Sequence, residues 1–124
     1  MSGELLLVAD DDDDILLLVT TRLRRDGYEV VSASSGDRAL ELAREHRPRL
    51  AVLDIGMPGL DGLEVLEQIR GDDELRDTIV LLLTAKAQES DVRRGYDSGA
   101  DAYVKKPFSP AELSTRVRAL LDET

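Results

Sequence analysis

Several short apolar runs in the sequence end at side chains that could take part in chemistry. In chain order these side chains are Asp10 and Asp11, Asp54, Thr84 and Lys106. Carboxylates held close together need a cation, and oxygen ligands with room for water favour Mg²⁺. A metal, a carboxylate nucleophile and a lysine are the parts required to transfer a phosphoryl group onto an aspartate. The residue types predict that chemistry if the fold brings them together.

Asp54 has the most informative surroundings. The uncharged run 50–53 leads into this single carboxylate, and Gly56, Pro58 and Gly59 follow within five positions. The pattern predicts a buried parallel strand that ends in an aspartate where the chain leaves the sheet. Taken alone, such an aspartate more often caps a turn, because its side chain readily bonds to nearby backbone.

Apolar runs alternate with helical patterns along the whole chain. We expect strands over 5–9, 29–33, 50–53, 79–83 and 102–104, and helices over about 15–25, 36–46, 62–69, 89–98 and 110–122. The expected N-caps are Asp13 or Asp14, Ser35, Asp61 and Ser109. The helix at 89–98 is the weakest, since it contains Gly95 and several poor helix formers.

Five alternating units of this kind predict one flavodoxin-like α/β domain over residues 1–124, a doubly wound parallel sheet with five helices. Right-handed crossovers favour the strand order 2-1-3-4-5, and the mixed polarity of 29–33 suits an edge strand. Ligands bind beyond the carboxyl ends of such strands, at the switch point. Three carboxylates, a hydroxyl and an ammonium would therefore converge at one edge. Each has an ordinary explanation singly, but their convergence favours a site.

In that site Asp54 would attack the phosphorus in line, and Lys106 with Mg²⁺ would neutralise the phosphoryl oxygens. Thr84 would donate a hydrogen bond to a further oxygen once the group arrives. The single histidine, His46, is expected at a helix end, and we assign it no catalytic role.

Composition excludes several other classes. The 124 residues include 16 Lys and Arg against 26 Asp and Glu, for a formal charge of −10, which argues against direct binding to nucleic acid or anionic membrane. Because the chain has no Cys, it cannot form disulfides, bind zinc through thiolates or use a thiol in catalysis. Apolar runs are too short for a membrane span or secretory signal, so the expected location is the cytoplasm. The chain stops soon after about residue 122, so we expect no output domain in it.

Four motifs occur in a characteristic order: ADD at 9–11, LDIGMPGLDG at 53–62, TA at 84–85 and GADAYVKKPF at 99–108. Together they resemble the receiver domain of two-component response regulators, and the resemblance covers essentially the whole chain. It implies a phosphoacceptor that catalyses only its own phosphorylation and dephosphorylation, not an enzyme acting on other substrates. The implied partners are a histidine kinase or phosphotransfer protein and a downstream effector, with the domain a monomer or a weak dimer on activation.

The resemblance also implies roles for individual residues. Asp54 would accept the phosphoryl group, and Asp10, Asp11, Asp54 and the backbone carbonyl of Gly56 would hold Mg²⁺. Lys106 would precede a cis peptide bond at Pro107. Thr84 and Tyr103 would form a conformational switch, read out on the face made by the fourth helix, fifth strand and fifth helix. Asp12-Asp13 departs from the Glu-Pro that receivers often carry there, which adds negative charge and leaves the metal pair intact.

Three alternatives fit less well. The run Asp10–Asp12 could be the D-x-D of a haloacid-dehalogenase-like phosphatase, but Asp14 departs from that signature and the chain has no cap domain. A flavin-binding module on the same sheet would need a first loop that cradles a phosphate, which five aspartates would repel. A calcium loop fails because Thr21 stands where a bidentate Glu is needed. The phosphatase remains the second hypothesis.

The first expected helix is more apolar than burial on one side requires. Residues 15–19 are five consecutive apolar residues. We expect Ile15, Leu18 and Leu23 to face inward and Leu16 and Leu17 to point at least partly outward, beside Asp54. An exposed pair there would offer a small docking patch to the histidine phosphodonor.

Overall fold

The computed structural model describes residues 3–85 and 99–123. Five parallel strands form one sheet in the order β2-β1-β3-β4-β5, as expected. Their bounds are β1 Leu5–Ala9, β2 Glu29–Ala33, β3 Leu50–Asp54, β4 Ile79–Thr84 and β5 Ala102–Lys105. The described helices are α1 Asp13–Arg25, α2 Gly36–His46, α3 Gly62–Arg70 and α5 Pro110–Asp122. The helix expected at 89–98 lies outside the described residues.

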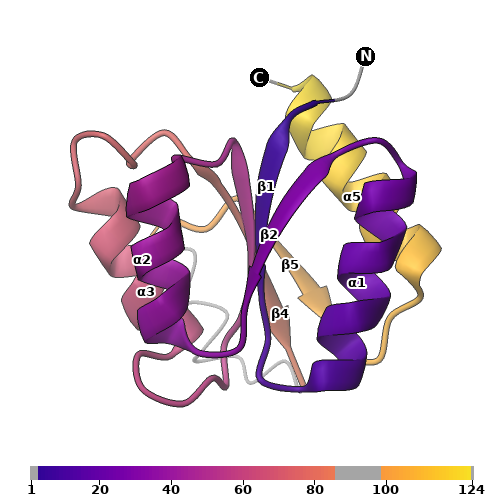
Figure 1. Cartoon of the computed structure of the whole chain (residues 1–124), viewed down its shortest axis with the longest axis horizontal. Coiled ribbons are helices and arrows are strands. Elements are labelled where there is room, and N and C mark those ends of the chain that lie inside the picture. The colour runs from indigo at the N-terminus through magenta and orange to yellow at the C-terminus, as the bar shows by residue number, and fades with distance from the viewer. Residues whose placement is uncertain (1–2, 86–98, 124) are drawn as a thin grey trace.

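Helices cover both faces of the sheet, with α2 and α3 on one side and α1 and α5 on the other (Figure 1). Alternate strand residues face opposite sides, so the sheet divides the apolar side chains into two clusters. In β3, Ala51 and Leu53 join the cluster under α2 and α3, while Leu50 and Val52 join the one under α1 and α5. The central strands β1, β3 and β4 are almost wholly buried, which explains their nearly unbroken apolar sequences.

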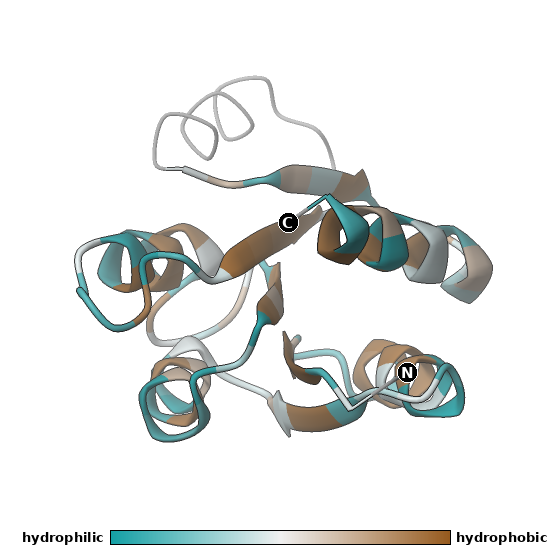
Figure 2. Cartoon of the chain, turned by 90° about the horizontal axis from the view of Figure 1, so that it is seen from above, coloured by the Kyte–Doolittle hydropathy of each residue, from teal (hydrophilic) through white to brown (hydrophobic). Residues whose placement is uncertain are grey.

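The apolar side of each described helix faces the sheet, as the hydropathy colouring shows (Figure 2). Three of the expected N-caps are confirmed: the side chains of Ser35, Asp61 and Ser109 accept from backbone N–H groups in the first turn. The cap expected at Asp13 or Asp14 was wrong. Asp12 caps α1, with its carboxylate accepting from two N–H groups of the first turn. Each of the five consecutive aspartates has a side chain able to cap a helix, so the position at which the backbone becomes helical decides which one does.

Within the described residues, no helix combines the length and apolarity needed to cross a membrane.

The orientation of α1 differs from the sequence prediction. Leu16 packs against the core beneath α1, whereas Leu17 and Leu18 are 66% and 48% exposed. The buried stripe continues through Val19, Thr20 and Leu23, at helical spacing from Leu16. Thr20 can be buried because its hydroxyl donates to the carbonyl of Leu17 at 3.2 Å. The predicted exposure of Leu17 is confirmed, and the inward position predicted for Leu18 was wrong. Leu16 is only partly buried but packs against the core, because the polar Thr20 completes the inner face that Leu18 was expected to fill.

The loop after Asp54 is held by close contacts with the N-terminal ends of α2 and α3. A Cβ atom on Gly36 would lie 1.7 Å from the carbonyl oxygen of Leu60, and one on Gly62 would lie 2.5 Å from the carbonyl oxygen of Asp54. The backbone N–H of Gly36 also donates to the carbonyl of Pro58 at 3.4 Å. Residues without a side chain at positions 36 and 62 thus allow this loop to pack directly on the helix ends.

This contact predicts the effect of a methyl group at position 36. We expect Gly36→Ala to lower the free energy of unfolding by about 1–3 kcal/mol, since the added carbon must displace backbone rather than a flexible side chain. Gly71→Ala is the matched control, because its Cβ would lie 3.4 Å from the nearest atom, the carbonyl oxygen of Glu67. Urea unfolding of both variants measures the difference, and equal stabilities would contradict the contact.

Candidate functional site

The side chains singled out in the sequence lie at the carboxyl edge of the sheet, the lower edge in Figure 1. Asp54 and Thr84 end β3 and β4, and Asp10 and Lys106 directly follow β1 and β5. Asp10 and Asp54 come from neighbouring strands, because β1 pairs with β3. Parallel pairing therefore brings together residues that are up to 96 positions apart in the sequence.

Lys106 bridges two carboxylates. Its Nζ atom lies 2.9 Å from Oδ2 of Asp10 and 3.3 Å from Oδ1 of Asp54. Asp10 is fully buried, Asp54 is 5% exposed and the Lys106 side chain is 16% exposed. Because two buried carboxylates share one partly buried ammonium, this group of three carries a net negative charge.

The same carboxylates fit a small hard cation. One oxygen each from Asp10, Asp11 and Asp54 lie within 4.8 Å of one another. Oδ1 of Asp10 accepts from the Asp12 N–H at 2.9 Å. Its buried Oδ2 accepts no hydrogen bond of good geometry from the described residues, although Lys106 lies close to it. An all-oxygen donor set with a buried, under-satisfied carboxylate oxygen matches the ligands that Mg²⁺ prefers.

The electrostatics reflect this crowding. Burial, followed by the neighbouring charge of Asp10, raises the pKa of Asp54, and the lowering effect of Lys106 and of the Gly56 N–H does not outweigh them. Burial alone would lower the pKa of Lys106, but its contacts with Asp10 and Asp54 are stronger and raise it. The site therefore favours the protonated, cationic form of Lys106. It disfavours the ionised form of Asp54 relative to an aspartate in water.

Thr84 and Tyr103 lie on the same face of the sheet. Leu82 is in register with Tyr103, and Thr84 with Lys105, so strand alternation points Thr84 and Tyr103 toward the side of α2 and α3. Thr84 is buried, and Tyr103 is partly buried against the cluster on that side. The peptide bond between Lys106 and Pro107 is cis, as the resemblance implied.

Sequence reasoning missed an apolar hollow beside Lys106. It has a volume of about 300 Å³ and is lined by Ile15, Leu18, Ala85, Lys106, Pro107 and Phe108. The only signal in the sequence is that apolar residues flank the polar site on two segments, after Asp14 and after Lys106. Their proximity depends on how α1 sits beside the loop that precedes α5.

Comparisons with known proteins decide the family. The sequence model of the response regulator receiver domain matches residues 6–118. The chain belongs to this family. It is 46% identical over 99 residues to the alkaline phosphatase synthesis transcriptional regulatory protein PhoP of Bacillus subtilis, covering 80% of the chain and 40% of that relative.

Solved receiver structures agree with this assignment. The receiver domain of a Francisella response regulator superposes with a TM-score of 0.88 at 34% identity, covering 98% of both chains. The receiver domain of a sensor histidine kinase from Pseudomonas aeruginosa, solved with magnesium in its active-site cleft, gives a TM-score of 0.86 at 28% identity, covering 94% of this chain and 96% of that one. The receiver spans half or less of the curated relatives that it matches. Nothing in these comparisons supports the phosphatase hypothesis.

The raised pKa of Asp54 predicts a stability effect in this receiver. A carboxyl whose folded-state pKa lies above its ordinary value destabilises the fold increasingly as pH rises through that raised pKa. Without divalent metal, Asp54→Asn should therefore raise the melting temperature at pH 7, and the gain should shrink as pH falls toward the ordinary range of aspartate. Thermal unfolding in EDTA measures it.

Asp73→Asn serves as the control, because the Asp73 side chain is 94% exposed and should show almost no effect. A lower melting temperature for Asp54→Asn at pH 7 would show instead that Asp54 stabilises the metal-free fold through Lys106.

Proposed function

We propose that this receiver accepts a phosphoryl group on Asp54 and so carries a signal from a phosphohistidine donor to an effector. The observation that carries the proposal is the position of Lys106, whose ammonium lies between Asp10 and Asp54 at the carboxyl edge of the sheet. A carboxylate beside a fixed cation at a strand end is suited to attack on phosphorus.

Each side chain has a defined part in this reaction. Asp54 supplies the attacking oxygen, and the bond between phosphorus and the donor breaks as the new acyl phosphate bond forms. Lys106 neutralises charge on the phosphoryl oxygens, which costs little reorganisation because its ammonium is already in place. Thr84, buried at the end of the neighbouring strand, donates its hydroxyl to a phosphoryl oxygen afterwards.

Asp10, Asp11, Asp54 and the backbone carbonyl of Gly56 are the proposed ligands of Mg²⁺. When bound, the ion would offset the repulsion between the carboxylates and the incoming phosphoryl oxygens. The proposal is supported by the oxygen cluster of the three aspartates and by the magnesium ion in the related receiver from Pseudomonas aeruginosa.

The proposed unit is one receiver domain over residues 1–124, whose catalysis is limited to its own phosphorylation and dephosphorylation. The proposed output face includes β5 and α5, and its remaining helix falls outside the described residues. An effector at that face is supported by the relatives, several of which are transcriptional regulators. The proposed donor is a histidine kinase or phosphotransfer protein.

Labelling with acetyl phosphate tests the reaction. We expect the protein to gain the mass of one phosphoryl group in the presence of Mg²⁺ and none in EDTA, because the carboxylate cluster needs a cation to admit the anion. Intact-mass spectrometry measures the adduct, and peptide mapping should place it on Asp54.

The control variants are Asp54→Asn, which should remain unlabelled, and Asp73→Asn, which should label as the wild type does. An unchanged adduct in Asp54→Asn would overturn the assignment. An adduct on Asp10 would instead favour the phosphatase-like chemistry.

The switch proposal makes a separate prediction. Thr84→Ala should still be labelled at Asp54, but beryllofluoride, a mimic of the phosphoryl group, should no longer change hydrogen exchange in β5. The reason is that Thr84 and Tyr103 share one face on adjacent strands, so the hydroxyl is the proposed link between the site and Tyr103. An identical exchange response in wild type and Thr84→Ala would contradict the link.

A further inference from the structure

The apolar hollow beside Lys106 adjoins the proposed phosphoryl site. Lys106 belongs to both, since its side chain lines the hollow and its ammonium lies 3.3 Å from Oδ1 of Asp54. Ala85, another lining residue, directly follows Thr84, the proposed donor to a phosphoryl oxygen. A small molecule whose phosphoryl group reaches Asp54 would therefore have its remaining atoms close to the hollow.

The lining of the hollow suits an aliphatic group. Among the described residues that line it, Lys106 alone carries a charge, and two carboxylates already contact its ammonium. Leu18 is 48% exposed, and Ile15 and Phe108 are partly exposed. An aliphatic group that covers these side chains removes apolar surface from water, which favours its binding.

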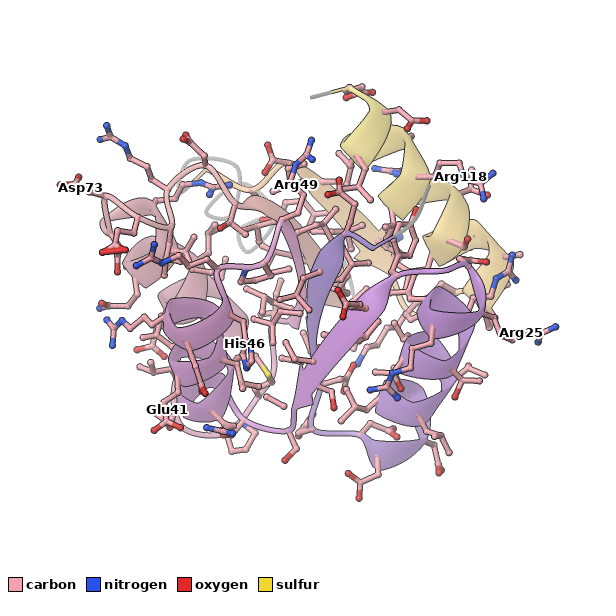
Figure 3. All side chains as sticks on the ribbon, turned by 45° about the horizontal axis from the view of Figure 1, so that its top comes forward. Arg25, Glu41, His46, Arg49, Asp73 and Arg118 are labelled. Atoms are coloured by element: carbon pink, nitrogen blue, oxygen red, sulfur yellow. The ribbon has the colours of Figure 1, made fainter. Side chains whose placement is uncertain are left out.

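The arginines of the neighbouring helices do not make the hollow a site for anions. Arg25 at the end of α1 and Arg118 on α5 point outward, away from the sheet (Figure 3). Neither of them lines the hollow. An anionic group there would meet Lys106 as its cation, in competition with two carboxylates, so an uncharged chain fits better.

The size of the hollow limits the length of that chain. Its volume is about 300 Å³, whereas a water molecule in the liquid occupies about 30 Å³. A chain of several carbon atoms therefore has room in it. The single methyl group of acetyl phosphate would cover little of the apolar lining.

The direction of transfer favours the same placement. In-line displacement requires the leaving group to depart on the side opposite the attacking oxygen. Asp54 ends β3 and is 5% exposed, so its oxygen attacks from within the edge of the sheet. The hollow is formed by α1 and by residues that follow β4 and β5. The leaving group is thus directed away from the sheet, toward the segments that form the hollow.

We propose that the hollow binds the acyl chain of a small-molecule phosphodonor, so that short aliphatic acyl phosphates such as butyryl phosphate label Asp54 faster than acetyl phosphate does. The inference rests on the proposed function of Asp54. An oxygen of Asp54 bonds to phosphorus as the bond from phosphorus to the bridging oxygen of the donor breaks. That oxygen keeps the electron pair and leaves as the carboxylate of a fatty acid, so no further reactant is needed.

A series of donors tests the proposal. Acetyl, propionyl and butyryl phosphate have leaving groups of nearly equal acidity, so they differ mainly in apolar surface. With Mg²⁺ and donor below saturation, butyryl phosphate should label the wild type about fivefold faster than acetyl phosphate, because its added methylene groups leave water. Propionyl phosphate should fall between them. Intact-mass spectrometry at timed intervals measures each rate, and the ratio of the butyryl rate to the acetyl rate is the readout.

Leu18→Ala and Leu17→Ala form a matched pair of variants. Both leucines are exposed on α1, but Leu18 lines the hollow and Leu17 does not. Leu18→Ala should lower the ratio to about twofold or less, whereas Leu17→Ala should keep the ratio of the wild type. Because the two donors are compared within each variant, a general loss of stability or of labelling cancels in the ratio.

Binding without transfer gives a second readout. Butyrylphosphonate and acetylphosphonate carry phosphorus on carbon, so Asp54 cannot displace their acyl groups as carboxylates. With Mg²⁺ present, butyrylphosphonate should shift the methyl NMR signals of Ile15 and Leu18 more than acetylphosphonate does. The methyl signals of Leu17 should change little with either compound.

The outcomes separate the two proposals. A wild type that no acyl phosphate labels would overturn the proposed function of Asp54 itself. Normal labelling by acetyl phosphate with a ratio near one would overturn only the proposal for the hollow. So would a ratio that Leu18→Ala leaves unchanged, or one that falls equally in Leu17→Ala.

Discussion

The site depends on one partly buried ammonium placed between two buried carboxylates. Asp10 and Asp54 come from adjacent strands and would repel each other in a poorly hydrated edge, so removing Lys106 would leave uncompensated charge there. The compensation is incomplete, as the raised pKa of Asp54 indicates. A site with surplus negative charge favours binding of a cation, which the proposed phosphoryl transfer would require.

The parallel sheet makes this arrangement possible. All five strands end at the same edge, and helices on both faces bury β3 and β4 completely. The charged groups at that edge therefore rest on rigid elements. The loop after Asp54 is also tightly packed, because Gly36 and Gly62 allow its backbone to contact the backbone at the N-terminal ends of α2 and α3. Rigid placement of Lys106 and Asp54 would lower the reorganisation needed in the proposed transfer.

The two sides of the sheet differ in what they offer to other molecules. Thr84 and Tyr103 point toward the side of α2 and α3, and this pair would respond to a phosphoryl group. The exposed Leu18 lies on the side of α1 and α5, where it lines the apolar hollow beside Lys106. The two sides of the sheet therefore offer different surfaces to other molecules, with Asp54 at the edge that they share.

Much of this was determined by the sequence alone. Alternating apolar runs and turn residues predicted the strands, their order and the edge at which Asp10, Asp54, Thr84 and Lys106 meet, and local cap chemistry identified Ser35, Asp61 and Ser109. Tertiary structure decided the rest. Five consecutive apolar residues surround a helix completely, so periodicity could not determine the rotation of α1, which packing of Leu16 and Thr20 settled. The contact between Lys106 and Asp10 likewise depends on side-chain geometry across 96 residues of sequence, which no local pattern encodes.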